Sequence, residues 1–135
     1  MTVLLRERYE PIEVVGQGGE GRVLKAIDRQ HDRIVALKVR TVFGDQDRDA
    51  LLAEARVLLD IPPHPNLPLV REDFFEDDQY VIAMDWIEGT DLSRLLRARG
   101  HPGLAASSVL RWLADAASAL THLHTLDPTV VHGDV

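Results

Sequence analysis

A glycine pattern close to the N-terminus places the strongest constraint on the fold of this chain. Gly16, Gly18 and Gly21 form G-x-G-x-x-G, which two unrelated kinds of phosphate-binding loop share. In a dinucleotide-binding fold, the last of these glycines opens a helix. Here, side chains alternate between polar and apolar over residues 22–27, a polar turn covers 28–32, and alternation resumes over 34–39. This strand-turn-strand pattern places the glycines at the tip of a β-hairpin and argues against the dinucleotide-binding fold.

The strand predicted over residues 34–39 carries one lysine in an apolar run, Val35-Ala36-Leu37-Lys38. Glycines lack a Cβ atom, so the backbone N–H groups of the glycine loop can approach phosphate oxygens closely. Because a strand holds Lys38 rigidly, we expect its ammonium group to point at the same phosphates. The alternative is an ordinary glycine-rich hairpin with a solvated lysine, and the presence of both motifs at this spacing argues against it.

The remaining patterns predict an α+β fold. Three further strands are expected over residues 8–15, 67–75 and 79–84. The polar segment 41–49 is expected to be a loop, and apolar residues at helical spacing predict a helix over residues 49–59. A short helix capped by Thr90 or Asp91 follows, and then a long helix over residues 105–126. We therefore expect a five-stranded antiparallel sheet with one helix, followed by two more helices.

Glu54 lies on the apolar side of the helix predicted over residues 49–59. It follows Leu51 and precedes Leu58 at helical spacing, so it shares their face. A carboxylate on a buried face needs a cationic partner, because burial of an unpaired charge is costly. Lys38, inside an apolar strand, needs an anionic partner for the same reason. A Lys38–Glu54 ion pair would satisfy both, and the simpler alternative is a surface glutamate at the edge of the apolar face.

The long helix over residues 105–126 carries a continuous apolar face. Its members recur at spacings of three and four residues: Val109, Leu113, Ala116, Leu120 and Leu123. Such a face needs a partner surface, and no later segment of this sequence supplies one. The face Val109–Leu123 is therefore a candidate for self-association or for contact with a segment outside this sequence.

Composition argues against several other functions. The chain has 15 basic and 22 acidic residues and a net charge of −7, which argues against a nucleic-acid or anionic-membrane surface. Because cysteine is absent, disulfides and thiolate metal sites are excluded, and no metal-binding cluster is expected. No apolar run has the length of a signal peptide or a membrane span. We expect a cytoplasmic protein, with any membrane anchor lying outside this segment.

Together, these motifs resemble those of the protein kinase family. The glycine loop and Val35-Ala36-Leu37-Lys38 match the family's phosphate-covering loop and its V-A-I-K strand. Later in the chain, His64-Pro65-Asn66-Leu67 is similar to the family's H-P-N-I turn, and His132-Gly133-Asp134 is similar to H-R-D of the catalytic loop. The resemblance covers nearly the whole sequence. It implies a kinase N-lobe with its αC helix over residues 1–84, a hinge over 85–90 and a partial C-lobe over 91–135.

The resemblance also implies ATP as the nucleotide and Mg²⁺ as its metal ion. Gly16, Gly18 and Gly21 would cradle the phosphates, and Lys38, held by Glu54, would position them. Val23 and Ala36 would sandwich the adenine, Met84 would be the gatekeeper, and backbone groups of Asp85 and Ile87 would form hydrogen bonds with the adenine. Asp91 would contact the ribose, and Asp134 would accept the proton of the substrate hydroxyl.

The function implied by the resemblance is transfer of the ATP γ-phosphate to serine or threonine hydroxyls of a protein substrate. The family's metal-binding asparagine and D-F-G aspartate have no counterpart in these 135 residues, so no transfer by the chain alone is expected. Glycine at position 133 replaces the arginine that contacts a phosphorylated activation loop, so switching by that route is not expected. Two alternatives stay open, a nucleotide-binding, pseudokinase-like regulator and a dimerising interaction module.

Overall fold

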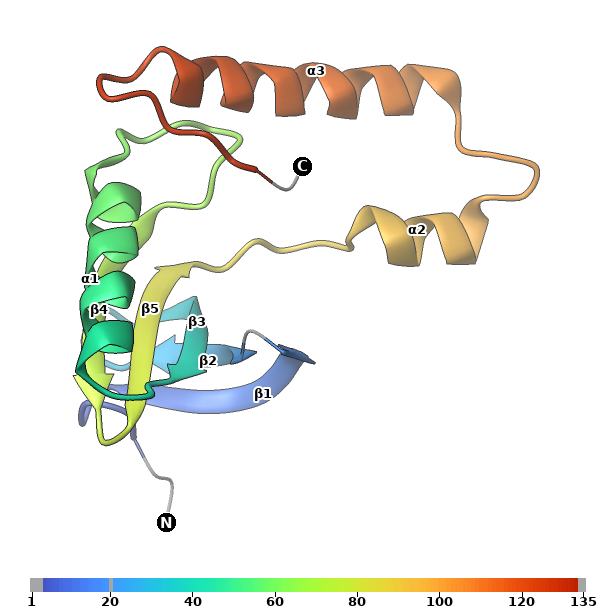
Figure 1. Ribbon diagram of the computed structural model, residues 1–135. Helices are drawn as coiled ribbons and strands as arrows, with labels where there is room; N and C mark the ends of the chain where they lie inside the picture. Colours follow the sequence, from blue (N-terminus) through green and yellow to red (C-terminus); the bar gives the residue numbers. More distant parts are fainter. Residues whose placement is uncertain (1–3, 20, 134–135) are drawn as a thin grey trace. The chain divides into compact units, whose positions relative to one another are not determined.

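The computed structural model describes residues 4–19 and 21–133. Five strands form one antiparallel sheet in the order β1-β2-β3-β5-β4 (Figure 1). The strands are β1 (Tyr9–Gly18), β2 (Gly21–Asp28), β3 (Arg33–Thr41), β4 (Val70–Glu76) and β5 (Gln79–Asp85), and the helices are α1 (Asp45–Asp60), α2 (Leu92–Arg99) and α3 (Ala106–His124). The predicted α+β fold, with its five-stranded antiparallel sheet and three helices, is confirmed.

Helix α1 begins one turn earlier than predicted. Residues 41–49 were expected to form a loop, yet the helix starts at Asp45, after Gly44 as its N-cap. Asp45 and Asp47 lie in the first turn, where carboxylates interact favourably with the positive end of the helix dipole. The Asp47 carboxylate also accepts a hydrogen bond from the backbone N–H of Phe43, at 2.9 Å. The aspartates that suggested a loop therefore stabilise the start of the helix.

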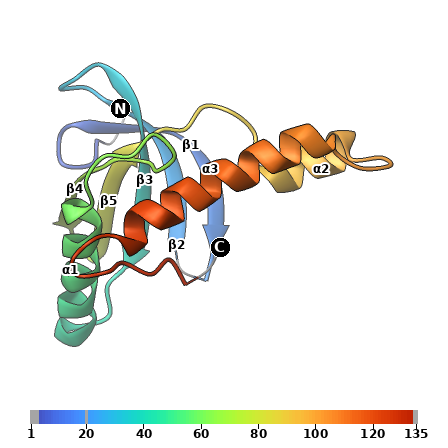
Figure 2. The ribbon, with the colours of Figure 1, turned by 90° about the horizontal axis from the view of Figure 1, so that it is seen from above.

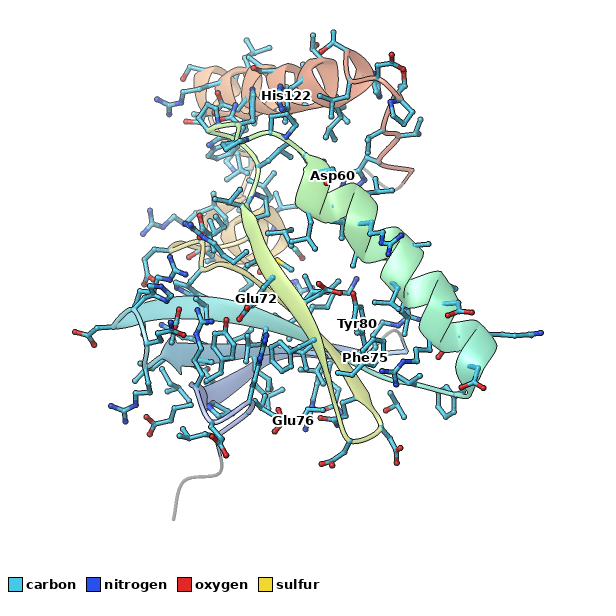
Figure 3. All side chains as sticks on the ribbon, turned by 90° about the vertical axis from the view of Figure 1, so that its left-hand side faces the viewer. Asp60, Glu72, Phe75, Glu76, Tyr80 and His122 are labelled. Atoms are coloured by element: carbon cyan, nitrogen blue, oxygen red, sulfur yellow. The ribbon has the colours of Figure 1, made fainter. Side chains whose placement is uncertain are left out.

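The sheet buries apolar side chains on both of its faces. One cluster is formed by alternate residues of the strands, among them Leu24, Leu37 and Val81. The other lies between the sheet and α1, and its buried members are Leu51, Ala55, Tyr80 and Ile82. In Figure 1 and in Figure 2, α1 runs beside β4 and β5. Figure 3 shows Phe75 and Tyr80 on the side of the β4–β5 hairpin that faces α1, with ring centroids 4.6 Å apart.

A buried ionic network joins the two edges of the sheet, where the sequence suggested only a polar turn over residues 28–32. Asp28 is 0% exposed and receives two hydrogen bonds from Arg8, at 2.7 and 2.8 Å. Arg8 also donates to Glu72 of β4 at 2.9 Å, and the Tyr9 hydroxyl of β1 donates to the same carboxylate. Since β1 and β4 are the two edge strands, these side chains close the sheet where no backbone ladder does.

The Arg8 hydrogen bonds hold the pKa of the Asp28 carboxyl well below its usual value, and this effect outweighs burial, which raises the pKa. His31 and the backbone N–H of Gln30 add further hydrogen bonds that act in the same direction. Asp28 is therefore the end of β2 and an ionised, buried part of the core. The predicted polar turn is present over residues 29–32, with the backbone N–H of His31 donating to the carbonyl of Asp28, and the role of Asp28 in the core adds to it.

The chain divides into two compact units. The first holds the sheet and α1, running to Pro62 and again from Pro68 to Ile87. The second comprises Pro63–Leu67 and the chain from Glu88 onward, so its boundary falls inside the residues assigned to the hinge. Within this second unit, the ring of His64 lies 4.9 Å from that of His122, and the amide of Asn66 donates to the carbonyl of Asp115 at 2.9 Å. These contacts fasten residues 63–67 to α3.

The apolar face of α3 is buried only near its C-terminal end. Leu123 is 4% exposed, whereas Leu113 is 60% exposed and the adjacent Leu110 is 66% exposed. None of the helices within residues 4–19 and 21–133 combines the length and the apolar character needed to cross a membrane.

Candidate functional site

The strand register places four predicted site residues on one face of the sheet. Val23 lies opposite Lys38, and Ala36 lies opposite Met84. Opposed residues of antiparallel strands point to the same face, as do residues two positions apart on one strand. Because Ala36 and Lys38 are two positions apart on β3, all four side chains share a face, which we call the Lys38 face. This face also carries Ile82, which lies opposite Lys38 and packs beneath α1.

The glycine loop stands at one end of this arrangement. Gly18 pairs with Gly21 at the tip of the β1–β2 hairpin, as the sequence predicts. Gly21 has φ +121°, and a Cβ atom there would lie 2.2 Å from the carbonyl oxygen of Val39, so only glycine fits. Around Gly18, a Cβ atom would meet nothing within 4 Å. At Gly18 and Gly19, the backbone is therefore open to an approaching group.

A cavity of about 240 Å³ adjoins the glycine loop, lined by Gly18, Gly19, Gly21, Arg40, Thr41 and Phe43. It combines backbone without side chains and one guanidinium group, a chemistry that suits an anion such as a phosphate. A second cavity, of about 470 Å³, is lined by Arg6, Glu7, Arg8, Arg29 and Gln30 at the opposite end of β2. Carboxylates lie 3.2 and 2.7 Å from its Arg6 and Arg8, closer than Glu54 lies to Arg40 at 3.8 Å, so we take the glycine-loop end as the candidate site.

Glu54 pairs with an arginine that the sequence reasoning overlooked. Its carboxylate lies 3.8 Å from Nη1 of Arg40, and the Glu54 side chain is 52% exposed. Arg40 follows Lys38 by two positions on β3, so it lies on the Lys38 face as well. The pairing of Glu54 with Lys38 stays a prediction, and Arg40 is the cation beside this carboxylate in the ion pair just described.

The chain leaves the sheet at Asp85 through a segment held by several contacts. Met84 packs against the cluster beneath α1. The backbone N–H of Asp85 donates to the carbonyl of Leu69 at 2.9 Å, and its carboxylate accepts from Nε of Arg71 at 2.8 Å. The next residue, Trp86, has the ammonium nitrogen of Lys25 at 4.6 Å from its ring centroid. Ile87 is 64% exposed.

Asp91 and Asp134 were expected to complete the site. Asp91 belongs to the second unit, where its carboxylate caps α2 by accepting from the backbone N–H of Arg94 at 2.8 Å. The cap role is thus confirmed, and its ribose contact stays a prediction. Asp134 lies outside the described residues. Within residues 4–19 and 21–133, no group of three or more His, Asp or Glu side chains is arranged to hold a metal ion.

Three residues of the site were missed by the sequence reasoning, namely Lys25, Arg40 and Trp86. A signal existed for the two cations, because Lys25 follows Val23 and Arg40 follows Lys38 by two positions on their strands. That spacing alone places each on the same face as its predicted neighbour. The contact of Trp86 with Lys25 had no such signal, since it joins a residue of β2 to the residue just after β5, and these two strands are not neighbours in the sheet.

Comparison with known proteins agrees with this fold. Residues 9–135 match the family model described as "Protein kinase domain". The chain therefore belongs to the protein kinase family, and the resemblance of its motifs is confirmed.

Individual relatives are moderately similar. The chain is 31% identical over 135 residues to serine/threonine-protein kinase PrkC of Bacillus subtilis, covering 95% of the chain and 19% of that protein. It is 27% identical over 131 residues to serine/threonine-protein kinase Nek1 of Mus musculus, covering 96% of the chain and 11% of that protein. A protein of Arabidopsis thaliana named as a probable inactive receptor kinase is 28% identical over 127 residues, covering 91% of the chain and 20% of that protein. The chain thus spans at most a fifth of the length of these relatives.

Proposed function

We propose that this chain is the nucleotide-binding part of a cytoplasmic serine/threonine protein kinase and that it binds ATP on the Lys38 face. The observation that carries the proposal is the strand register, which puts Val23, Ala36, Lys38 and Met84 on one face, next to a glycine loop with open backbone. Two curated relatives named as serine/threonine kinases support this choice of family branch. The substrate of the whole protein would be a serine or threonine hydroxyl.

Each residue has a specific part in this proposal. The backbone N–H groups near Gly16, Gly18 and Gly21 bind phosphate oxygens, and the ammonium group of Lys38 balances the phosphate charge. At the other end of the nucleotide, Val23 and Ala36 enclose the adenine beside Met84, and its polar edge bonds to backbone groups of Asp85 and Ile87. Asp91 accepts from the ribose.

The chemical step involves residues beyond this face. Glu54 leaves its ion pair with Arg40, pairs with Lys38 instead and so positions the Lys38 ammonium group. Asp134 orients the attacking hydroxyl and accepts its proton. Mg²⁺, when bound with the nucleotide, neutralises the charge that develops on the phosphates. Among residues 4–19 and 21–133, no group of three or more His, Asp or Glu side chains is arranged to hold it.

Phosphoryl transfer depends on positioning and on metal, so the proposal predicts binding without transfer for these 135 residues. The test incubates the purified chain with radiolabelled ATP, Mg²⁺ and a mixture of protein substrates. Label should be retained reversibly on the chain and should not become covalently attached to any protein. Covalent labelling that is abolished in Lys38→Met would show instead that the chain alone is a complete catalyst.

A second candidate function is self-association through the α3 face Val109–Leu123. The specific observation in its favour is that two leucines of this helix are largely exposed, Leu110 at 66% and Leu113 at 60%. A nucleotide-binding regulator without catalysis is compatible with either proposal.

If copies associate through this face, light scattering should report a dimer for the wild type and a monomer for Leu113→Glu, since a charge at the centre of an apolar interface is costly. Arg111→Glu, an exposed position on the opposite side of the same helix, is the charge control and should remain dimeric. A well-folded wild-type chain that stays monomeric at all concentrations would exclude this function.

A further inference from the structure

The ammonium group of Lys25 lies over the ring of Trp86, with Nζ 4.6 Å from the ring centroid. A cation within about 6 Å of an indole centroid is attracted to the negative face of the ring. We propose that Lys25 is a positioning residue for base recognition: by holding Trp86, it fixes the backbone of Asp85–Ile87 in the geometry that binds the adenine edge. This inference rests on the proposed function, and it adds a residue to which the family motifs assign no role in this chain.

The register places Lys25 at the correct end of the site. Lys25 lies opposite Ala36, and Ala36 in turn lies opposite Met84, so the three residues form one row across β2, β3 and β5. The parallel row contains Val23, Lys38 and Ile82, nearer the glycine loop. The Lys25 row, which holds Ala36 and Met84, therefore belongs to the base end of the Lys38 face, and the next row, in which Val23 also faces the base, brings Lys38 closer to the glycine loop.

The segment after β5 is anchored from two directions. On one side, β4 holds Asp85 through the Arg71 hydrogen bond to its carboxylate, 2.8 Å long. The carbonyl of Leu69, just before β4, accepts from the Asp85 backbone N–H at 2.9 Å. On the other side, β2 holds Trp86 through Lys25, across the width of β3. Trp86 stands between Asp85 and Ile87, so fixing its side chain limits rotation of the two peptide groups that recognise the base.

Preorganisation of this kind changes affinity without adding a contact to the ligand. A donor and an acceptor that already stand in the bound geometry lose less conformational freedom on binding. The loss of Lys25 should therefore weaken binding of every ligand that contains adenine, whatever its number of phosphates. An ammonium group that contacted phosphate directly would instead give an effect that grows with phosphate charge. The two behaviours are distinguishable by comparing adenosine with ATP.

The test uses the full 135-residue chain in a Trp112→Phe background, which leaves Trp86 as the sole tryptophan. Lys25→Met keeps the chain length of the side chain and removes the cation. Lys25→Met should change the fluorescence emission of Trp86 in the ligand-free chain. It should also weaken the binding of adenosine and of ATP by the same factor, on the order of threefold to tenfold. Lys25→Arg should restore both signals, and Arg56→Met, an exposed cation on α1, should alter neither.

Three results would overturn the proposal. They are unchanged Trp86 emission in Lys25→Met, unchanged affinity for adenosine, and a loss confined to ATP. If the wild-type chain binds neither adenosine nor ATP, the proposed function itself fails and this inference fails with it. If the wild type binds both ligands and Lys25→Met binds them as tightly as the wild type, the proposed function stands and the positioning role of Lys25 is rejected.

Discussion

Replacing Asp28 with asparagine should lower the free energy of unfolding by about 1.5–3 kcal/mol, because it removes the charge-assisted hydrogen bonds between a fully buried carboxylate and Arg8 and leaves Arg8 with Glu72 as a carboxylate partner. The Asp28 side chain is fully buried, and the paired Arg8 side chain is 17% exposed. Two Arg8 nitrogens donate to it at 2.7 and 2.8 Å, and Nε of Arg33 lies 3.2 Å from the same carboxylate. Urea unfolding followed by circular dichroism measures the loss.

Asp32→Asn is the matched control for this variant. Asp32 is four positions away, is exposed, and has φ +47°, a conformation that asparagine tolerates. The control removes the same charge and should change stability by less than about 0.5 kcal/mol. Equal stability of the two variants would mean that the ionic network does not contribute to folding.

The Asp28 carboxylate also makes the stability of the fold depend on pH. Its pKa is depressed in the folded state by the hydrogen bonds from Arg8, so it stabilises the fold above the unfolded-state pKa, near 3.9, and this contribution is lost as pH falls further. The stability difference between wild type and Asp28→Asn should therefore be constant near neutral pH and shrink below about pH 4. A difference that stays constant into strong acid would contradict the assigned charge state.

Replacing Lys38 with methionine should weaken ATP binding at least about tenfold, since a hydrogen bond to a charged group contributes about 1.5–3 kcal/mol. Lys38 stands opposite Val23 and two positions from Ala36, on the face proposed to hold the nucleotide. Methionine has a similar length and no charge, so packing on the strand is preserved. Competition against a fluorescent ATP analogue measures the affinity of each variant.

Adenosine provides the internal control for the Lys38 variant. It lacks phosphates, so its affinity should be nearly the same in wild type and Lys38→Met. Together with Lys25→Met, which should weaken both ligands equally, the pair of lysine variants separates the phosphate end of the site from the base end. A Lys38→Met chain that binds ATP as tightly as wild type would contradict the phosphate role of Lys38.

The parts of the fold that the sequence predicted are those set by local pattern. Alternation over residues 22–27 and 34–39 predicted β2 and β3, and the same alternation put Lys38 on a face with Ala36. Local pattern misplaced the start of α1, because Asp45 and Asp47 favour both a loop and the first turn of a helix. It also began the fourth strand at residue 67, where β4 starts at Val70, and ended the first strand at residue 15, where β1 runs to Gly18.

The missed features depend on contacts between distant residues. The sequence shows Asp28 only as part of a polar turn. Its role in the core depends on Arg8, 20 positions earlier, which the β1–β2 pairing brings beside it. Glu72, which lies 64 positions after Arg8 in the sequence, joins the same network because the two edges of the sheet come together. Glu54 likewise had a predicted partner in Lys38, and the competing partner Arg40 becomes evident only when β3 and α1 are placed together. No periodicity in a single segment carries this information.

The most direct test of the central claim is a map of amide chemical-shift changes in the chain on addition of ATP and Mg²⁺. The account predicts changes clustered at the glycine loop, at Ala36–Lys38 and at Met84–Ile87. Residues around the cavity lined by Arg6, Arg8 and Arg29, at the other end of the sheet, should be unaffected. Changes centred on that second cavity, or a folded chain that shows no changes at any ATP concentration, would contradict the assignment of the Lys38 face as a nucleotide site.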